Sequence, residues 1–134
     1  MVKASAKPSL IDGIGLFADE KIPKGTITWK FDPQFDILFD PKEVAAMPEG
    51  KRSFIERYAY LSKDSGKYLY SIDDSRFTNH SAKNPSLAGA VVVPGEIETC
   101  AAALRDIEPG EELTINYRLF DVHDAEGTEA YLDS

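Results

Sequence analysis

The sequence is almost free of cysteine. Cys100 stands alone among 134 residues, so no disulfide can form within the chain, and only His80 and His123 are present to join it in a zinc site. Long hydrophobic runs are also missing, since no stretch approaches the about 20 apolar residues that a membrane-spanning helix needs. Residues 1–10 lack the apolar centre of a signal peptide. These absences predict an intracellular, soluble protein with no membrane partner and no bound metal.

Basic residues are in short supply. Lysine and arginine together number 15, against 23 aspartate and glutamate residues, which leaves a net charge of −8 with both histidines neutral. Direct binding to a nucleic-acid backbone needs a basic surface, so this composition argues against it. The charge favours a cationic partner. At 134 residues, with 43% hydrophobic and 28% charged residues, the chain fits a single globular domain.

Proline and glycine interrupt the chain often, and long helical patterns are few. Asp40 followed by Pro41 predicts the start of a short helix, and apolar residues between 54 and 61 have the spacing of a second one. Alternation of apolar and polar residues predicts strands at 26–31, 68–72, 90–93, 97–104 and 112–117. In the first of these, Ile27, Trp29 and Phe31 share one face. We therefore expect a mainly β fold with a few short helices.

The composition also suggests a domain organisation. We expect an N-terminal segment at 1–10, the domain itself at 11–120 and an acidic tail at 121–134. The tail contains five acidic residues and no lysine or arginine, so we expect it to be loosely held. Two similar segments, Ile22-Pro23-Lys24-Gly25 and Ile107-Glu108-Pro109-Gly110, each precede an expected strand, but two copies do not make a repeat architecture.

The segment Gly13-Ile14-Gly15-Leu16-Phe17-Ala18 has the letters of a dinucleotide-binding fingerprint. That fingerprint must open a helix within a βαβ unit, whereas Pro23, Gly25 and a strand follow here. The segment therefore predicts either a glycine turn or a loop whose backbone approaches a ligand closely. The pattern alone favours the turn.

A second group of polar residues is Asn79-His80-Ser81. No GxSxG turn surrounds Ser81, which argues against a serine hydrolase. Taken alone, the three residues indicate a hydrogen-bonded turn. The tyrosines, among them Tyr58, Tyr70 and Tyr117, are individually typical of core aromatic residues with bonded hydroxyls.

Taken in order along the chain, these segments resemble the SET domain, the fold of the main family of lysine methyltransferases. The glycine segment is followed by Tyr58-Ala59-Tyr60, by Tyr70-Ser71-Ile72-Asp73 and by Arg76-Phe77-Thr78-Asn79-His80-Ser81. The series closes with Arg105-Asp106-Ile107 and Gly110-Glu111-Glu112-Leu113-Thr114-Ile115-Asn116-Tyr117. The family patterns are GxG, YxF or YxY, YxID, RFxNHSxxPN and RDIxxGEELTxDY. The resemblance runs from Gly13 to Phe120.

Three positions depart from these patterns. Ala82 replaces the cysteine that usually follows NHS, Asn84-Pro85-Ser86 displaces the PN pair by one residue, and Asn116 replaces the aspartate of the closing DY. The chain also has no cysteine-rich flanking segment of the kind that binds zinc in some relatives. The alternative to an enzyme is therefore a non-catalytic SET module that serves as a protein-interaction domain.

The resemblance implies a β-clip-like SET fold with a C-terminal pseudoknot. It implies methyl transfer from S-adenosylmethionine, released as S-adenosylhomocysteine, to lysine side chains of a basic protein such as a histone or a histone-like protein. The implied cofactor-binding residues are Gly13, Ile14, Gly15, Tyr58, Asn79, His80, Tyr117 and Phe120. The implied substrate channel is lined by Tyr58, Tyr70, Ile115 and Tyr117, and its three tyrosines are the catalytic candidates. The transfer requires no metal.

Ile115 stands where the family tunes the number of methyl groups added. A tyrosine there favours a single transfer, because its hydroxyl can hold a water beside the amine, whereas a smaller apolar residue permits more. Ile115 therefore predicts di- or trimethyl-lysine. Without zinc-binding flanks, either a homodimer or the acidic tail would complete the channel.

Overall fold

The computed structural model describes residues 2–134. The first half of the chain contains β1 (Ala4–Pro8), β2 (Ile14–Ala18), β3 (Ile27–Trp29), β4 (Asp36–Phe39), α1 (Pro41–Ala45) and α2 (Glu49–Tyr58). The second half contains β5 (Tyr60–Leu61), β6 (Tyr68–Ser71), β7 (Asn79–His80), β8 (Leu87–Val91), β9 (Cys100–Ala103), β10 (Glu112–Ile115) and α3 (Val122–Glu126). Three 3₁₀ helices complete it, η1 (Asp74–Phe77), η2 (Tyr117–Leu119) and η3 (Ala130–Asp133). The fold is mainly β with short helices, as the sequence predicts.

The described strands form two sheets. In the larger sheet neighbouring strands follow the order β1-β2-β10-β8-β9-β3, and β7 pairs with β10 beside this path. The smaller sheet has the order β4-β6-β5. β10 pairs antiparallel with β2 and parallel with β7 and β8. β10, which is part of the closing motif, therefore lies beside two segments that are distant from it in sequence, the glycine segment and Asn79-His80.

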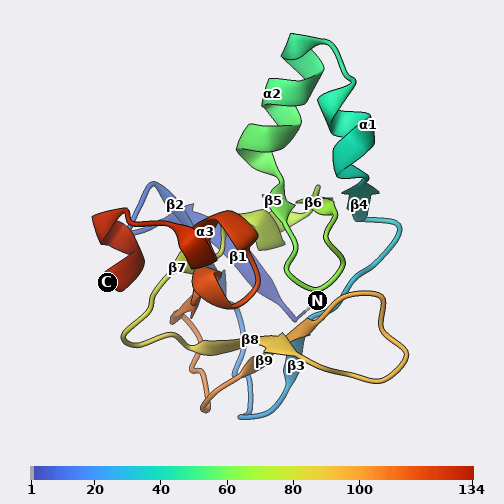
Figure 1. Cartoon of the computed structure of the whole chain (residues 1–134). Coiled ribbons are helices and arrows are strands. Elements are labelled where there is room, and N and C mark those ends of the chain that lie inside the picture. The colour runs from blue at the N-terminus through green and yellow to red at the C-terminus, as the bar shows by residue number, and fades with distance from the viewer. Residues whose placement is uncertain (1) are drawn as a thin grey trace.

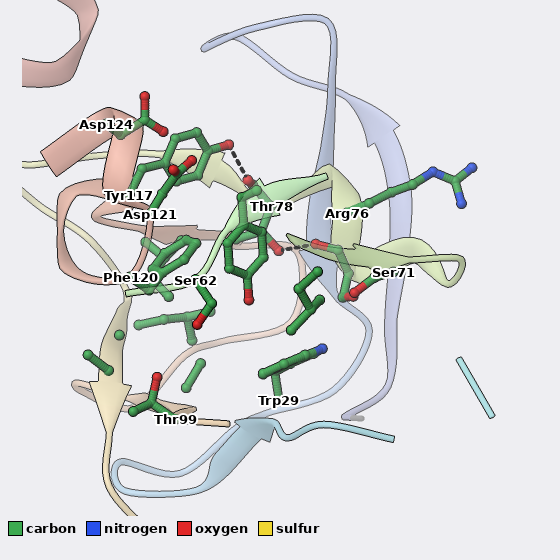
Figure 2. A pocket seen from close by; sticks show the side chains of 18 of the residues that line it. Trp29, Ser62, Ser71, Arg76, Thr78, Thr99, Tyr117, Phe120, Asp121 and Asp124 are labelled. Carbon is green, nitrogen blue, oxygen red and sulfur yellow. Dashed lines mark hydrogen bonds between the residues drawn. The ribbon is translucent and has the colours of Figure 1, made fainter. Parts of the chain in front are cut away.

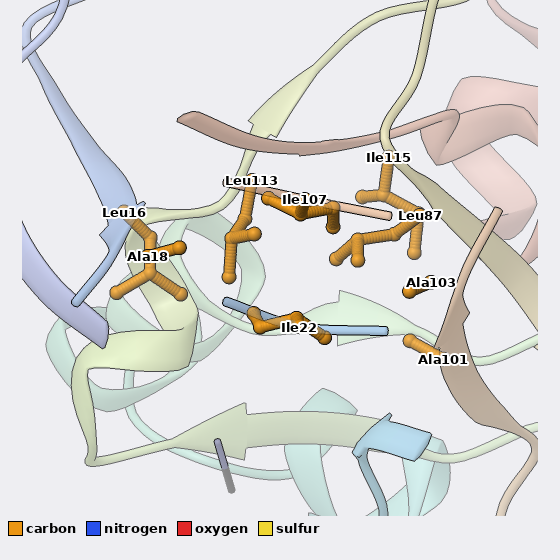
Figure 3. Close-up of a cluster of buried hydrophobic side chains, with 9 residues drawn as sticks. All are labelled: Leu16, Ala18, Ile22, Leu87, Ala101, Ala103, Ile107, Leu113 and Ile115. Carbon is orange, nitrogen blue, oxygen red and sulfur yellow. The ribbon is translucent and has the colours of Figure 1, made fainter. Parts of the chain in front are cut away.

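The main hydrophobic core lies against the larger sheet (Figure 3). Its nine buried residues are Leu16, Ala18, Ile22, Leu87, Ala101, Ala103, Ile107, Leu113 and Ile115. Ile22 and Ile107 come from the two similar segments of the sequence and exchange two backbone hydrogen bonds of 2.8 Å. Each segment ends in a glycine with positive φ, 85° at Gly25 and 87° at Gly110, which turns the chain into the next strand. The two similar segments are therefore partners in space.

The two helices α1 and α2 stand together at one end of the molecule, next to the smaller sheet (Figure 1). Asp40 caps α1 as predicted, because its carboxylate accepts a hydrogen bond of 2.8 Å from the Lys42 N–H. A second core of Val44, Ile55 and Ala59 holds the two helices against each other. Tyr70 packs against this second core from β6.

Two local expectations from the sequence are wrong. The strand at 26–31 is shorter, and its buried residue is Thr28, which is 2% exposed, whereas Ile27 is 40% exposed. The pairing of β3 with β9 is irregular between Ile27 and Trp29, so simple alternation does not predict the inward face. The acidic tail is not loose either. It forms α3 and η3, and Leu132 is fully buried.

Candidate active site

A cavity of about 360 Å³ is lined by residues of both sheets. Figure 2 shows Tyr117 and Asp124 at one end of the cavity and Trp29 and Thr99 at the other. Four of the residues that the sequence predicts for the site contribute to the lining, namely Tyr58, Ile115, Tyr117 and Phe120. These four residues are up to 62 positions apart in the chain.

Gly89 keeps space open beside Ile115. A β-carbon on Gly89 would stand 3.2 Å from Cδ1 of Ile115, closer than side chains usually approach, and 3.4 Å from Cδ1 of Phe120, in van der Waals contact. Both residues line the cavity, and Ile115 is 7% exposed. A side chain at position 89 would therefore narrow the cavity where Ile115 and Phe120 meet.

Tyr117 is held at both its ends. Its hydroxyl donates a hydrogen bond of 2.5 Å to the Thr78 carbonyl (Figure 2), and its backbone N–H donates to Nδ1 of His80 at 3.0 Å. Burial, and then the nearby Asp124, raise the pKa of the Tyr117 phenol well above its usual range. The phenol therefore stays neutral near pH 7. Because its proton is bonded to Thr78, its oxygen can accept a further hydrogen bond.

An aromatic wall continues from Tyr117 through Phe120 to Tyr60. The ring centroid of Phe120 lies 5.9 Å from that of Tyr117 and 5.0 Å from that of Tyr60, both in edge-to-face geometry. Burial, and then Glu98, raise the pKa of Tyr60, so its phenol is neutral as well. Tyr60 lines the cavity but was not among the predicted site residues. Its place in the Tyr58-Ala59-Tyr60 motif was the signal that could have identified it.

Tyr58 and Tyr70 lie in different surroundings. Tyr58 contributes to the cavity but is 55% exposed, with the Phe54 ring 4.9 Å away between centroids. Tyr70 is not part of the cavity lining. On β6 the residues that face the cavity are Leu69 and Ser71, whereas Tyr70 points to the second core and meets Phe54 at 6.0 Å. The sequence expectation placed Tyr70 beside Tyr117 in one channel, and this structure does not bring them together there.

The glycine segment lies against Glu112 of β10. A β-carbon on Gly15 would collide with the carboxylate of Glu112, so this position requires glycine for an internal reason. Gly13 has φ of 42° and open space around it. The family resemblance implies that the backbone of this segment approaches the cofactor closely. At Gly15 the structure shows that a side chain of the protein excludes the β-carbon.

The Asn79 amide lies among hydrogen-bond acceptors. Its Nδ2 is 2.9 Å from Oε1 of Glu112, 3.1 Å from the Asp12 carbonyl, 3.2 Å from Oγ of Ser9 and 3.5 Å from the Ile14 carbonyl. An amide nitrogen has two protons, so it cannot satisfy four acceptors at once. The surplus acceptors, one of them a carboxylate, suit an ammonium group. The α-amino group of S-adenosylmethionine has that chemistry, so the residues present fit this cofactor.

Both ring nitrogens of His80 are engaged within the protein. Nδ1 accepts from the Tyr117 N–H at 3.0 Å, and Nε2 lies 2.9 Å from the Leu132 carbonyl. The imidazole therefore has no free nitrogen for a ligand. A contact between His80 and a cofactor would have to come from its main chain.

Sequence reasoning missed many polar residues of the cavity lining, among them Thr28, Asp121 and Asp124. Burial, and then Asp124, raise the pKa of Asp121 to about 6. The Thr28 hydroxyl is buried and has no hydrogen-bond partner among residues 2–134. Asp121 and Asp124 lie beyond the closing motif, in the tail, where only their charge was noted. No pattern in the sequence marks Thr28.

Within residues 2–134 no three histidine, cysteine, aspartate or glutamate side chains are grouped so that they could hold a metal ion. No helix in the same range is both long and apolar enough to cross a bilayer.

A curated relative of this chain is the histone-lysine N-methyltransferase trr of Drosophila melanogaster. The two are 27% identical over 128 residues, which is 87% of this chain and 5% of the fly protein. The chain therefore spans a small part of that relative's length.

Two solved structures resemble the fold. A Plasmodium falciparum protein named as a candidate histone methyltransferase matches with a TM-score of 0.59 and 18% identity, over 86% of this chain and 92% of that one. A humanized mutant of the Chaetomium thermophilum Polycomb Repressive Complex 2, bound to the inhibitor GSK126, matches with a TM-score of 0.64 and 25% identity. That match covers 87% of this chain and 15% of the other. A model of the SET domain family matches residues 13–118, and the chain therefore belongs to the SET domain family.

Proposed function

We propose that the chain is a protein-lysine methyltransferase that uses S-adenosylmethionine. The observation that carries the proposal is the position of Tyr117. On one side its ring meets His80 at 5.0 Å between centroids, next to Asn79 and the glycine segment, and on the other side it lines the cavity. A tyrosine in this position can act between a cofactor and a substrate. Membership of the SET family and the name of the fly relative support the same reaction.

The cofactor site would lie at the glycine segment, Asn79 and His80. When bound, S-adenosylmethionine supplies a methyl group on a positively charged sulfur. The carbonyls of Asp12 and Ile14, together with Glu112, would accept hydrogen bonds from its α-ammonium group, at the acceptors that now surround Asn79. Phe120 offers an aromatic face for the adenine ring.

The cavity would receive the lysine side chain and favour its neutral form. A lysine of ordinary pKa is only about 0.04% neutral at pH 7. The apolar wall of Leu113, Ile115 and Phe120 disfavours the ammonium, as does the positive charge of the sulfonium, so both lower the lysine pKa. Loss of the ammonium proton to water leaves a lone pair that can attack the methyl carbon.

Tyr117 would orient that lone pair. Its hydroxyl proton is committed to Thr78, so its oxygen can accept an N–H of the amine and turn the lone pair toward the methyl group. With the lone pair so directed, bound S-adenosylmethionine would supply its methyl group to the nitrogen and would be left as S-adenosylhomocysteine. Alignment of this kind can supply roughly 7–11 kcal/mol of the barrier reduction. Tyr117 does not act as a base in this scheme, because its pKa is raised rather than lowered.

The charge of the chain favours a basic protein as substrate, such as a histone or a histone-like protein. The cavity lining contains two carboxyl groups, Asp121 and Asp124, and two guanidinium groups, Arg57 and Arg76, so it has no strong charge of one sign. The net charge of the whole chain, −8, attracts a cationic segment. The space that Gly89 leaves beside Ile115 would accommodate a methylated amine, so the enzyme would add more than one methyl group.

Two of the three departures from the family patterns have structural roles that are compatible with catalysis. The side chain of Asn116 caps η2 by accepting from the Arg118 N–H at 3.0 Å, and asparagine caps as well as aspartate does. Ser86 of the displaced segment accepts a hydrogen bond of 2.9 Å from the Thr114 N–H and thereby fixes β10. Neither departure removes a group from the cavity, so the structure gives the non-catalytic alternative no support of its own.

We also propose that residues 11–120 form the catalytic unit and that the tail at 121–134 completes it. The tail packs on His80 and supplies Asp121 and Asp124 to the cavity. On this proposal a single chain has a complete channel, and a homodimer is not required for it.

The test is intact-mass analysis of a panel of lysine-rich proteins incubated with the chain and S-adenosylmethionine. We expect whole-methyl mass increments on at least one basic protein, and their loss when S-adenosylmethionine is omitted. If no protein gains mass while the chain binds S-adenosylmethionine, the non-catalytic module becomes the better account.

A further inference from the structure

The imidazole of His80 connects two distant parts of the chain. Its Nδ1 lies 3.0 Å from the Tyr117 backbone nitrogen, and its Nε2 lies 2.9 Å from the carbonyl oxygen of Leu132 in the tail. His80 is 7% exposed, so water does not readily replace either partner. The ring therefore bridges the closing motif and a segment that lies beyond residue 118, where the SET family match ends.

The two partners fix the protonation state of the ring. A backbone N–H can only donate, so Nδ1 must carry a lone pair toward Tyr117. A carbonyl oxygen can only accept, so Nε2 must carry the proton toward Leu132. The arrangement therefore selects the neutral imidazole that is protonated at Nε2. The opposite tautomer would point an N–H at the N–H of Tyr117 and leave the Leu132 carbonyl without a donor.

The tail is anchored well enough to hold the Leu132 carbonyl in place. The Leu132 side chain is fully buried, and a β-carbon on Gly127 would stand 2.8 Å from its Cδ1, so this turn packs closely. The Arg118 guanidinium donates to the carbonyls of Asp124 at 3.2 Å and Gly127 at 3.1 Å. The same group pairs with Asp133 at 3.3 Å.

A neighbouring aromatic residue adds to this anchoring. The Tyr131 ring stands edge-on to His80 at 5.9 Å between centroids, and its hydroxyl donates to Asp124 at 3.1 Å. Three side chains, those of Arg118, Tyr131 and Leu132, thus hold the carbonyl against the imidazole by independent contacts.

We propose that the segment Thr128–Ser134 positions Tyr117 through His80. The Leu132 carbonyl keeps the proton of the imidazole on Nε2, and this leaves Nδ1 free to fix the backbone of Tyr117. The hydroxyl end of Tyr117 is fixed separately by Thr78. This inference rests on the proposed function for its effect on catalysis, but its structural part is independent of the reaction. Leu132 and the His80 ring are positioning groups and do not touch the reacting atoms.

The structural part is tested by nitrogen NMR of the histidine rings in the full chain and in a variant that ends at Gly127. In the full chain we expect His80 to show a bare Nδ1 and a protonated Nε2. In the shortened variant we expect the chemical shifts of the two His80 ring nitrogens to move toward each other, because the ring then exchanges between its two tautomers. The exposed His123 gives an internal reference in the same spectrum, and a variant that lacks only Ser134 is the matched control. Unchanged His80 nitrogens in the shortened variant would overturn the inference.

The variant Arg118→Gln keeps the chain at full length and covers the case in which the shortened chain does not fold. It removes the Arg118 contacts with Asp124, Gly127 and Asp133 and leaves those of Tyr131 and Leu132, so we expect the same change at the His80 nitrogens to a smaller degree. A folded Arg118→Gln chain in which the tail is released but the His80 nitrogens match those of the wild type contradicts the inference.

The catalytic part is tested with the same variants. We expect the shortened chain to lose at least tenfold in kcat with a change in KM for the protein substrate of less than threefold, because the tail sets the position of Tyr117. A folded shortened chain with the kcat of the full chain overturns the catalytic part. If the full chain transfers no methyl group at all, the proposed function fails, and the NMR result still decides whether the tail sets the His80 tautomer.

Discussion

The carboxylate of Glu112 occupies the space that a β-carbon on Gly15 would need. Ser9 and Asn79 both donate hydrogen bonds to this carboxylate, at 2.8 and 2.9 Å, so it cannot easily move away. The glycine segment, β7 and β10 thus meet at one carboxyl group. The contact explains why the second glycine of the GxG pattern is required here even without a ligand.

Replacement of Gly15 by alanine should therefore destabilise the fold. We expect Gly15→Ala to lower the free energy of unfolding by about 1–3 kcal/mol, the usual cost of forcing an extra carbon into a packed site. Urea unfolding measures the change. The matched control is Gly50→Ala in the first turn of α2, where the new carbon meets no atom within 4 Å. The control should gain about 0.5–1 kcal/mol, because alanine is the better helix former. Equal stability of the Gly15→Ala chain and the wild type would contradict the Glu112 contact.

The second prediction concerns the cofactor site. Asn79→Ala removes an amide that is nine-tenths buried among four acceptors. We expect the binding free energy of S-adenosylmethionine to weaken by about 1–3 kcal/mol, because the Asp12 carbonyl and Glu112, which would hold the cofactor's ammonium group, lose the buried amide that positions them. Calorimetric titration gives the affinity. Ser81→Ala changes an exposed hydroxyl two residues away whose one bond is to the Asn84 N–H, and it should bind as the wild type does. Wild-type affinity of a folded Asn79→Ala chain would remove this residue from the site.

The third prediction concerns pH. The pKa of Asp121 is raised from 3.8 to about 6, so its ionisation opposes folding. The neutral carboxyl group of Asp121 makes its full favourable contribution to the free energy of unfolding below pH 3.8. This contribution is lost as the pH rises through about 6. Asp121→Asn should therefore stabilise the chain at pH 7 by about 1–2 kcal/mol, after allowance for the partial exposure of the group. The gain should vanish below about pH 4.

Thermal unfolding at several pH values checks this dependence. Asp74→Asn, at an exposed position in η1, is the control and should change the stability little at any pH. If the Asp121→Asn chain gained the same stability at pH 4 and pH 7, the raised pKa of Asp121 would not be the cause.

The fourth prediction concerns the number of methyl groups. Ile115→Tyr places a hydroxyl where the cavity is open beside Gly89, so a water can be held next to the amine. We expect wild-type chain under excess cofactor to yield di- or trimethyl-lysine and the variant to yield mainly monomethyl-lysine. Mass spectrometry of a substrate peptide distinguishes the products. A wild-type enzyme that stops at one methyl group would show that Ile115 does not set this number.

Much of the site follows from the order of the motifs. The sequence places Asn79-His80 and the closing motif in one family pattern, and the structure brings them together through the pairing of β7 with β10. The sequence could not predict that Glu112 excludes a side chain at position 15. The collision depends on where the Glu112 side chain lies, and Glu112 is 97 residues later in the chain. A sequence pattern shows that a glycine is needed without showing which atom excludes the side chain.

The position of Tyr70 and the order of the tail show two further limits. Alternation along β6 predicts that the side chains of Tyr70 and Ser71 lie on opposite faces of the strand. One face of β6 borders the cavity and the other packs against the second core. The pattern therefore cannot say which face is the cavity. For the tail, the expectation of a loose segment was based on its acidic residues and did not consider Leu132. The complete burial of this apolar residue orders the segment.

The measurement that tests the account most directly is the single-turnover rate of methyl transfer by Tyr117→Phe, compared with Tyr70→Phe. Tyr117→Phe removes the oxygen that would orient the amine, and we expect its rate to fall roughly 10²–10³-fold with little change in cofactor affinity, as when one preorganised hydrogen-bonding group is lost from an active site. Tyr70→Phe removes a hydroxyl that lies outside the cavity lining, and its rate should stay within about twofold of the wild type. The opposite result, a Tyr117→Phe chain as fast as the wild type and a slow Tyr70→Phe chain, would contradict the claim that Tyr117 and this cavity form the active site.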